Sequence, residues 1–227
     1  MHSGYIAAAT FLLLTGTGAC AQVVKLHRRA GAFKRGEISR EQIYAGLLPV
    51  RELWSCTAFL LFALSGATRP YTDYFLIASR VPVVVITTII IFYLARCGAS
   101  GARRCLHLVL AGDAILAAVL LAVCIGGVQL PPLAPRFVDG AVALVGALLV
   151  YGKLSQAREM HRTRQSEAVS WIREGGLVVK DLTGLYYAAT VGLDLLFIGI
   201  THALSIVSST TICAVKHRLE SKHPTGE

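Results

Sequence analysis

Seven apolar stretches, each about as long as a bilayer crossing requires, are the feature that most constrains the fold of this chain. They lie near residues 4–26, 46–66, 73–95, 105–127, 137–157, 176–192 and 194–215. Inside lipid, only helices and closed barrels satisfy all backbone hydrogen bonds, and stretches of this length match helices. Charged residues make up only 15% of the chain, against about 25% in soluble domains. The sequence therefore predicts an all-α membrane protein with seven transmembrane helices.

The basic residues predict how these helices are oriented. Of the 22 Lys and Arg residues, nineteen lie in or beside the loops that follow stretches one, three and five, or in the C-terminal tail. The opposite loops hold only Arg69 and Arg136. Because basic loops stay on the cytoplasmic side, we expect the N-terminus outside and the C-terminus inside, as in a multi-pass protein of the cell (inner) membrane.

The same charge pattern bears on partners. The net charge of +9 would suit nucleic acid if the basic residues shared one water-facing surface, but here they punctuate apolar segments. We therefore expect contacts with membrane lipids, whose anionic headgroups attract basic loops, and no nucleic acid. The six cysteines are scattered without the paired spacing of zinc sites or disulfide frameworks, which predicts no metal.

Three short matches, in the same order, indicate that the chain contains two copies of a three-helix unit. The matches are Gln22 with Gln156, Arg51-Glu52 with Lys180-Asp181, and Arg80 with His202. Arg80 and His202 are separated in sequence by the same number of residues as Arg96 and Arg218.

A duplicated three-helix unit needs a linker helix, because three crossings reverse the direction of the chain. We assign residues 1–98 to the first repeat, 99–130 to the linker transmembrane helix, and 131–227 to the second repeat and cytoplasmic tail. The predicted fold is thus two parallel three-helix bundles joined by a linker helix. In transporters built from parallel repeats, the solute site lies near the midplane between the halves.

This layout resembles the PQ-loop superfamily, which includes the SWEET sugar transporters. The resemblance covers nearly the whole chain and rests on the three-one-three arrangement, the outside N-terminus, and Gln22 and Gln156 before basic loops. It implies alternating access between the halves, with both glutamines bonded to backbone near the inner end. The family motif is Pro-Gln, whereas Ala21 and Ser155 precede the glutamines here. Since those prolines are thought to act as hinges, their absence favours a protein that does not transport.

Polar residues within the apolar stretches are candidates for solute binding. Arg80 costs a few kcal/mol in lipid unless it faces a polar cavity or a carboxylate. Asp113 is the other charge well inside a stretch, so an Arg80–Asp113 pair is expected, as a structural ion pair or as part of a solute site. His202 lies among hydroxyl residues; it either carries protons in a wet cavity or bonds a backbone carbonyl in a closely packed helix.

The charged pairs Arg51-Glu52 and Lys180-Asp181 are predicted to lie at the cytoplasmic ends of their helices. Opposite charges there bridge neighbouring helices or close an inner gate. A moving gate and a static clasp use the same residue types, and the sequence leaves both open. Gln22 and Gln156 belong to the same predicted inner region.

These residues lead to a small-solute transporter as the first functional hypothesis. A basic midplane favours a small polar solute that is anionic or zwitterionic. A non-transporting receptor, or an accessory subunit of a larger membrane complex, is the alternative. Small residues in the fifth stretch pack within the bundle, against a second copy, or against another membrane protein, and the sequence does not decide among these.

An enzyme is not expected, and neither is a cofactor. Asp113 directly follows Gly112, and Asp194 comes two residues after Gly192, each in a predicted membrane helix; this arrangement resembles that of intramembrane aspartyl proteases. The predicted topology places the two carboxylates far apart, however. No nucleophile–base pair or phosphate loop is evident either.

Overall fold

The chain folds into a bundle of long helices. The computed structural model describes residues 2–67, 74–128, 135–191 and 196–222. Seven α-helices and no strands occur in these ranges, with a 3-10 turn before α2 and a π-helical turn after α4. In order, the elements are α1 (His2–Lys34), η1 (Glu41–Tyr44), α2 (Pro49–Ala67), α3 (Tyr74–Arg96), α4 (Ala102–Leu120), η2 (Leu121–Ile125), α5 (Pro135–Thr163), α6 (Trp171–Val191) and α7 (Leu196–Lys222).

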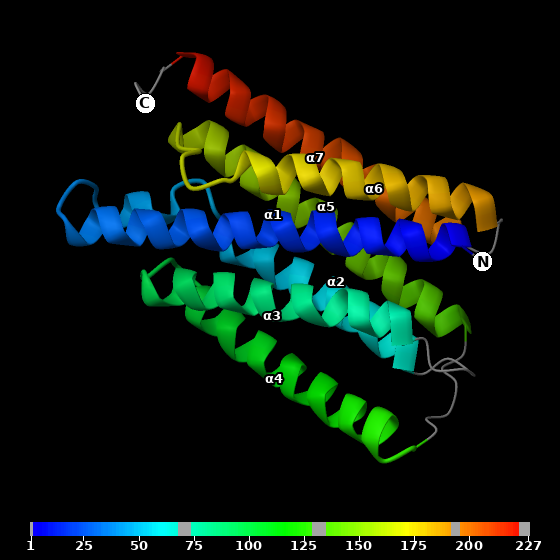
Figure 1. Cartoon of the computed structure of the whole chain (residues 1–227). Helices are drawn as coiled ribbons and strands as arrows, with labels where there is room; N and C mark the ends of the chain where they lie inside the picture. The colour runs from blue at the N-terminus through cyan, green and yellow to red at the C-terminus, as the bar shows by residue number, and fades with distance from the viewer. Residues whose placement is uncertain (1, 68–73, 129–134, 192–195, 223–227) are drawn as a thin grey trace.

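Successive helices run in alternating directions along the bundle. Figure 1 shows α1, α3, α5 and α7 ending at one end of the molecule, where α2, α4 and α6 begin. The two chain termini consequently lie at opposite ends (Figure 1). We call the end where α1 ends the basic end, because exposed basic side chains gather there: Arg28, Lys34, Arg35, Arg40, Arg96, Arg103, Arg104, Arg158, Arg162, Arg164 and Arg218.

Six of the helices form a closed ring, and α4 lies outside it. Contacts join the ring in the order α1, α3, α2, α5, α7, α6 and back to α1. Within this ring, α3 lies between α1 and α2, and α7 lies between α5 and α6. Helix α4 packs on α2 and α3, as Figure 1 also shows. Opposite members of the ring are α1 and α5, α3 and α7, and α2 and α6.

Several helices extend beyond the apolar stretches that predict them. Helix α1 continues to Lys34 and α5 to Thr163, because Lys, Arg, Gln and Glu residues that follow the apolar runs are good helix formers. Helix α6 begins at Trp171, earlier than the predicted 176, so Lys180-Asp181 lies in its middle. Four charged residues on α6 conceal this start from an apolar scan.

The turn between α3 and α4 is held by a side chain from an earlier loop. Arg40 donates from Nε to the carbonyl of Cys97, at 2.8 Å, and from Nη2 to that of Arg96, at 3.3 Å. These bonds satisfy carbonyls that the end of α3 leaves without helical partners. Gly98 has a φ of +83°, and a Cβ there would lie 3.1 Å from Nη2 of Arg40. The turn therefore requires glycine for its backbone conformation and for the closeness of Arg40.

Apolar side chains cover much of the outer surface of the bundle. Within the described ranges, two helical stretches, Glu41–Leu64 and Ala102–Ile125, are long and apolar enough to cross a membrane. Helix α4, with its π-helical extension, is the more exposed, and Ile125 is 79% exposed. Other large exposed apolar side chains lie on α1, α3, α5, α6 and α7, at Leu13, Phe92, Leu144, Tyr186 and Val207 respectively.

Candidate functional site

The interior of the bundle is charged. Eight charged side chains are buried in the described part of the chain, each at most 6% exposed. A buried charge is costly unless it is paired and hydrogen-bonded, so each of these needs a local explanation. They come from α2, α5, α6 and α7: Arg51, Glu52, Lys153, Arg173, Glu174, Lys180, Asp181 and Lys216.

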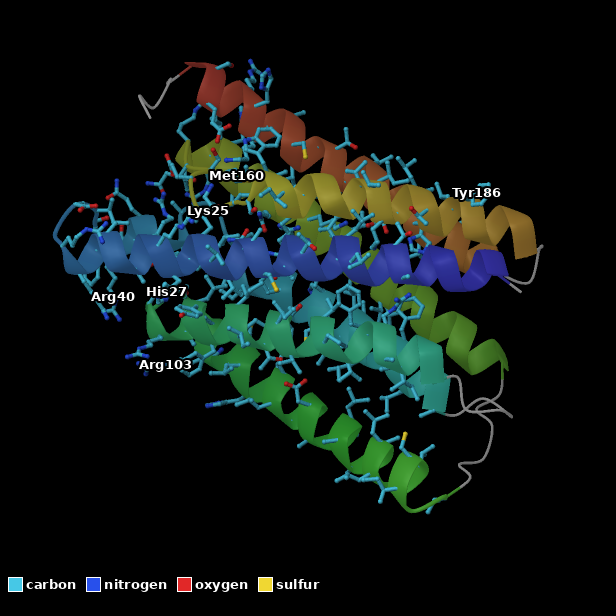
Figure 2. All side chains as sticks on the ribbon, in the orientation of Figure 1. Lys25, His27, Arg40, Arg103, Met160 and Tyr186 are labelled. Carbon is cyan, nitrogen blue, oxygen red and sulfur yellow. The ribbon has the colours of Figure 1, made fainter. Side chains whose placement is uncertain are left out.

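Exposed charges, in contrast, gather at the basic end. Figure 2 shows Lys25, His27, Arg40 and Arg103 toward this end, and Tyr186 toward the other. The molecule therefore has a charged interior, an apolar outer surface along its length, and a basic rim at one end. This is the reverse of the distribution in a soluble domain, where charged residues are rarely buried.

Two reciprocal ion pairs connect α2 and α6 across the ring. Arg51 on α2 donates to Glu174 on α6, with nitrogen–oxygen distances of 2.7 and 2.8 Å. Arg173 on α6 donates in bidentate fashion to Glu52 on α2, at 2.7 and 2.5 Å. We call these four residues the clasp. Arg51 and Glu174 are fully buried, and bidentate charge-assisted bonds of this kind are among the strongest in proteins.

The clasp draws attention to a second possible repeat match for Arg51-Glu52. Arg51-Glu52 was matched with Lys180-Asp181, but the structure joins it to Arg173-Glu174. The two Arg-Glu dipeptides are identical, and their separation in sequence equals that between Arg80 and His202. The sequence analysis did not find this second match because the predicted sixth stretch began too late, which left Arg173-Glu174 in the preceding loop.

Two glycines bring the helices of the clasp close to their neighbours. A Cβ on Gly18 of α1 would lie 3.0 Å from Cα of Arg173 on α6. A Cβ on Gly152 of α5 would lie 3.1 Å from Cα of Arg51 on α2. Each glycine thus contacts the backbone of a clasp arginine. Both stand four residues before the glutamine of their own helix.

The two glutamines are fully buried near the clasp. Gln22 donates from Nε2 to the carbonyl of Ala168, at 2.7 Å, and its Oε1 accepts the backbone N–H of Ser170, at 3.0 Å. It therefore fixes the segment that leads into α6. Gln156 instead accepts a bond from Nη1 of Arg51, at 3.0 Å. One glutamine holds backbone, as the family resemblance implies, whereas the other holds the clasp.

A second buried cluster surrounds Asp181, about two turns or 10 Å along α6 from Glu174. Its carboxylate accepts bonds from Lys180 and from the hydroxyl of Ser205. Nδ1 of His202 lies 2.8 Å from Oδ1. Nζ of Lys153 lies 3.9 Å from Oδ2, which is an ion pair without a hydrogen bond. Lys180-Asp181 thus belongs to a cluster with α5 and α7, away from the cytoplasmic ends where it was expected.

Lys153 completes this cluster from α5. Its ammonium donates to the hydroxyls of Ser205 and Ser209, at 2.5 and 2.7 Å, and lies 3.3 Å from the carbonyl of Ser205. Ser205 and Ser209 stand one turn apart on α7, so both hydroxyls face α5. His202, on the preceding turn of α7, joins them through Asp181.

Arg80 and Asp113 do not form the ion pair that was expected. Oδ2 of Asp113 accepts a bond from the hydroxyl of Thr88, at 2.8 Å. Thr88 lies about 12 Å along α3 from Arg80, because the antiparallel helices place the two charges at different heights. The guanidinium of Arg80 lies 5.7 Å from the ring centre of Phe62. Across the ring, Arg80 is within electrostatic range of His202. Asp113 therefore lies apart from the buried clusters, and Asp194 is outside the described residues.

Sequence reasoning missed Lys153, Arg173 and Glu174 because it assigned them to a basic loop. The repeated Arg-Glu dipeptide at the offset of Arg80 and His202 was the signal that would have found the clasp. In the described residues, no group of three or more His, Cys, Asp or Glu side chains is arranged to hold a metal ion. No protein-family model matches the sequence, and no curated protein is significantly similar to it.

Proposed function

We propose that this chain is an integral membrane protein whose seven helices cross the bilayer, with the basic end in the cytoplasm. The charged interior and apolar outer surface support this, because lipid solvates apolar side chains and not charged ones. The basic rim at one end supports the orientation, since cytoplasmic loops are enriched in Lys and Arg. The N-terminus is then outside and the C-terminus inside.

The order in which the helices contact one another around the ring supports two parallel three-helix repeats, joined by α4. In each triplet the third helix lies between the other two, and α1 contacts α6 as α5 contacts α2. Gly18 and Gly152 make matching contacts with the clasp arginines. An axis along the membrane normal relates repeats of this kind in known transporters. Membership of the PQ-loop superfamily is part of this proposal.

From this architecture we infer a transporter of a small polar solute, anionic or zwitterionic, that works by alternating access between the repeats. The clasp is the observation that carries the inference. It joins the two helices that stand opposite each other in the ring, near the basic end. Apolar residues would hold a static bundle at least as well as buried ion pairs do. Ion pairs that exchange protein for water partners suit a contact that opens, so the clasp is an inner gate in its closed state.

Flux measurements on reconstituted protein test this function. The assay follows uptake of monocarboxylates, amino acids and sugars into liposomes by wild type and by an apolar-clasp variant. That variant carries Arg51→Met, Glu52→Leu, Arg173→Met and Glu174→Leu. We expect wild type to transport at least one solute saturably. The apolar clasp should keep or raise thermal stability but reduce uptake about tenfold or more, because the closed state becomes the more stable one.

A matched control replaces an exposed ion pair in the same way. Glu159→Leu with Arg162→Met removes the pair that joins these residues on α5, at 2.7 Å, and should leave uptake unchanged. Full uptake by a folded apolar-clasp variant would contradict the gating role. Absence of saturable uptake of every solute by wild type would contradict transport itself.

A non-transporting receptor or accessory subunit is the second candidate, and one observation favours it. Helices α1 and α5 continue unbroken through Gln22 and Gln156, where the related family has prolines. A receptor binds its ligand saturably from one side and needs no second accessible state. Binding without flux in the same preparation distinguishes the two candidates.

A further inference from the structure

Buried hydrogen-bond donors without partners lie beside the clasp. Gln156 accepts a bond from Arg51, but its own Nε2 group donates to no atom of the described residues, although the side chain is fully buried. Nε of Arg51 is likewise buried without an acceptor. In folded proteins such groups are satisfied by a ligand or an ordered water in nearly every case.

Lys153 stands one turn from Gln156 on the same face of α5, and its ammonium makes no hydrogen bond to a carboxylate in the described residues. Its hydrogen bonds go to hydroxyl and carbonyl oxygens of α7, while Asp181 is 3.9 Å away. Asp181 bonds Lys180, His202 and Ser205 instead. The hydroxyl of Ser209 accepts from Lys153 and donates to no acceptor in the described residues.

The charges of this region select the ligand. Arg51 contacts Glu174, Arg173 contacts Glu52, and Lys180 contacts Asp181. The two clusters thus hold four cations and three carboxylates. Lys153 is the cation whose nearest carboxylate oxygen, Oδ2 of Asp181 at 3.9 Å, lies beyond hydrogen-bond distance. The ammonium of Lys153 already donates to three oxygens of α7, so it offers a ligand its charge, while the donors left for a ligand are Nε2 of Gln156 and the hydroxyl of Ser209. One positive charge with several hydrogen-bond donors suits a ligand group that carries one negative charge and accepts hydrogen bonds. A carboxylate is such a group.

We propose that Lys153, Gln156 and Ser209 bind the carboxylate of a small monocarboxylate solute. Lys153 and Ser209 lie where α5 contacts α7, and Gln156 joins this place to the clasp through Arg51. In the proposed membrane orientation a solute there would reach the cytoplasm only after the clasp opens. This assignment rests on the proposed transport function for its physiological meaning, but the binding chemistry is testable without flux.

Equilibrium binding of radiolabelled propionate to detergent-purified protein tests the site. We expect saturable binding by wild type that excess propionamide, the neutral analogue, does not displace. Lys153→Gln should weaken binding about tenfold or more, because it removes the positive charge that attracts the carboxylate. Ser209→Ala should weaken it about threefold to tenfold while retaining the charge. Lys216→Gln is the matched control, since Lys216 is equally buried but bonds Ser166 and Glu220 at the basic end.

The outcomes separate the site from the transport proposal. Absence of propionate binding by wild type, equal displacement by propionamide, or unchanged binding by folded Lys153→Gln and Ser209→Ala would overturn the site. If liposome uptake of monocarboxylates persists in Lys153→Gln, the site is wrong while transport stands. If propionate binds as expected but wild type takes up no solute, the site is supported and transport is contradicted.

Discussion

Gln22 is the residue whose contribution to stability is most directly predictable. Its side chain is fully buried and makes a hydrogen bond with the carbonyl of Ala168 and another with the N–H of Ser170. Gln22→Ala removes both partners and leaves two backbone groups buried without bonds. We expect a loss of about 2–6 kcal/mol in the free energy of unfolding, since each of the two stranded groups costs about 1–3 kcal/mol. Thermal or denaturant unfolding in detergent measures this.

The control for Gln22 is an exposed glutamine. Gln42→Ala removes a side chain at the surface of the first loop, whose amide oxygen accepts from the backbone of Ser39. It should change stability by less than about 0.5–1 kcal/mol. Equal effects of the two substitutions would mean that Gln22 does not hold the segment before α6.

Which side chains contact one another was the feature of this structure that the sequence predicted least well. Residues unusual for an apolar stretch, such as Arg80 and His202, were found because their cost in lipid marks them. Their partners were not found, because a partner depends on helix order and on height along the bundle. Asp113 looked available to Arg80, yet it bonds Thr88. Lys153 carried no signal at all, because it stands next to a basic loop.

At the level of elements, the close contacts of Gly18 and Gly152 lead to a prediction. A Cβ at either position would come within 3.0 or 3.1 Å of an arginine Cα, and backbone does not yield as a flexible side chain does. Gly18→Ala and Gly152→Ala should each destabilise the protein by about 1–3 kcal/mol.

Gly16→Ala is the matched control on α1. A Cβ there would meet no atom within 4 Å, so alanine should be neutral or stabilise the helix by up to about 1 kcal/mol. The measurement is the unfolding midpoint of the three variants in one detergent. If Gly18→Ala were as stable as Gly16→Ala, α1 and α6 would not pack as closely as described.

Helix number and type could be predicted from the sequence, but helix ends could not. Long apolar runs indicate helices because their length matches a bilayer crossing, and the described part of the chain contains seven α-helices. Charged helix formers then extend α1 and α5 beyond the runs. Helix α6 was the hardest, since Arg173, Glu174, Lys180 and Asp181 place four charges on one helix. Lys180 follows Arg173, and Asp181 follows Glu174, by seven residues or about two turns, so all four share the inward face of α6.

For the whole molecule, the burial of charged residues and the exposure of apolar ones bear on whether the bundle is soluble or lies in a bilayer, which composition alone does not decide. A soluble bundle of this composition would place its charges in water and its apolar residues inside. Here the clasp and the Asp181 cluster are internal, whereas residues such as Ile125 and Leu144 are exposed. Pairing makes the internal charges tolerable, and a surrounding bilayer, as proposed above, would make the apolar exterior tolerable. Each feature is costly in water and consistent with a bilayer.

Membrane orientation gives the last prediction, by labelling single cysteines in a variant that lacks the six native ones. Ser100 and Val128 are both exposed and lie at opposite ends of α4 with its π-helical turn. Ser100→Cys should react with a membrane-impermeant maleimide only in inside-out vesicles, because it lies at the basic end. Val128→Cys should react only in intact cells. The opposite pattern would reverse the orientation, and reaction of both cysteines from one side would mean that α4 does not span the membrane.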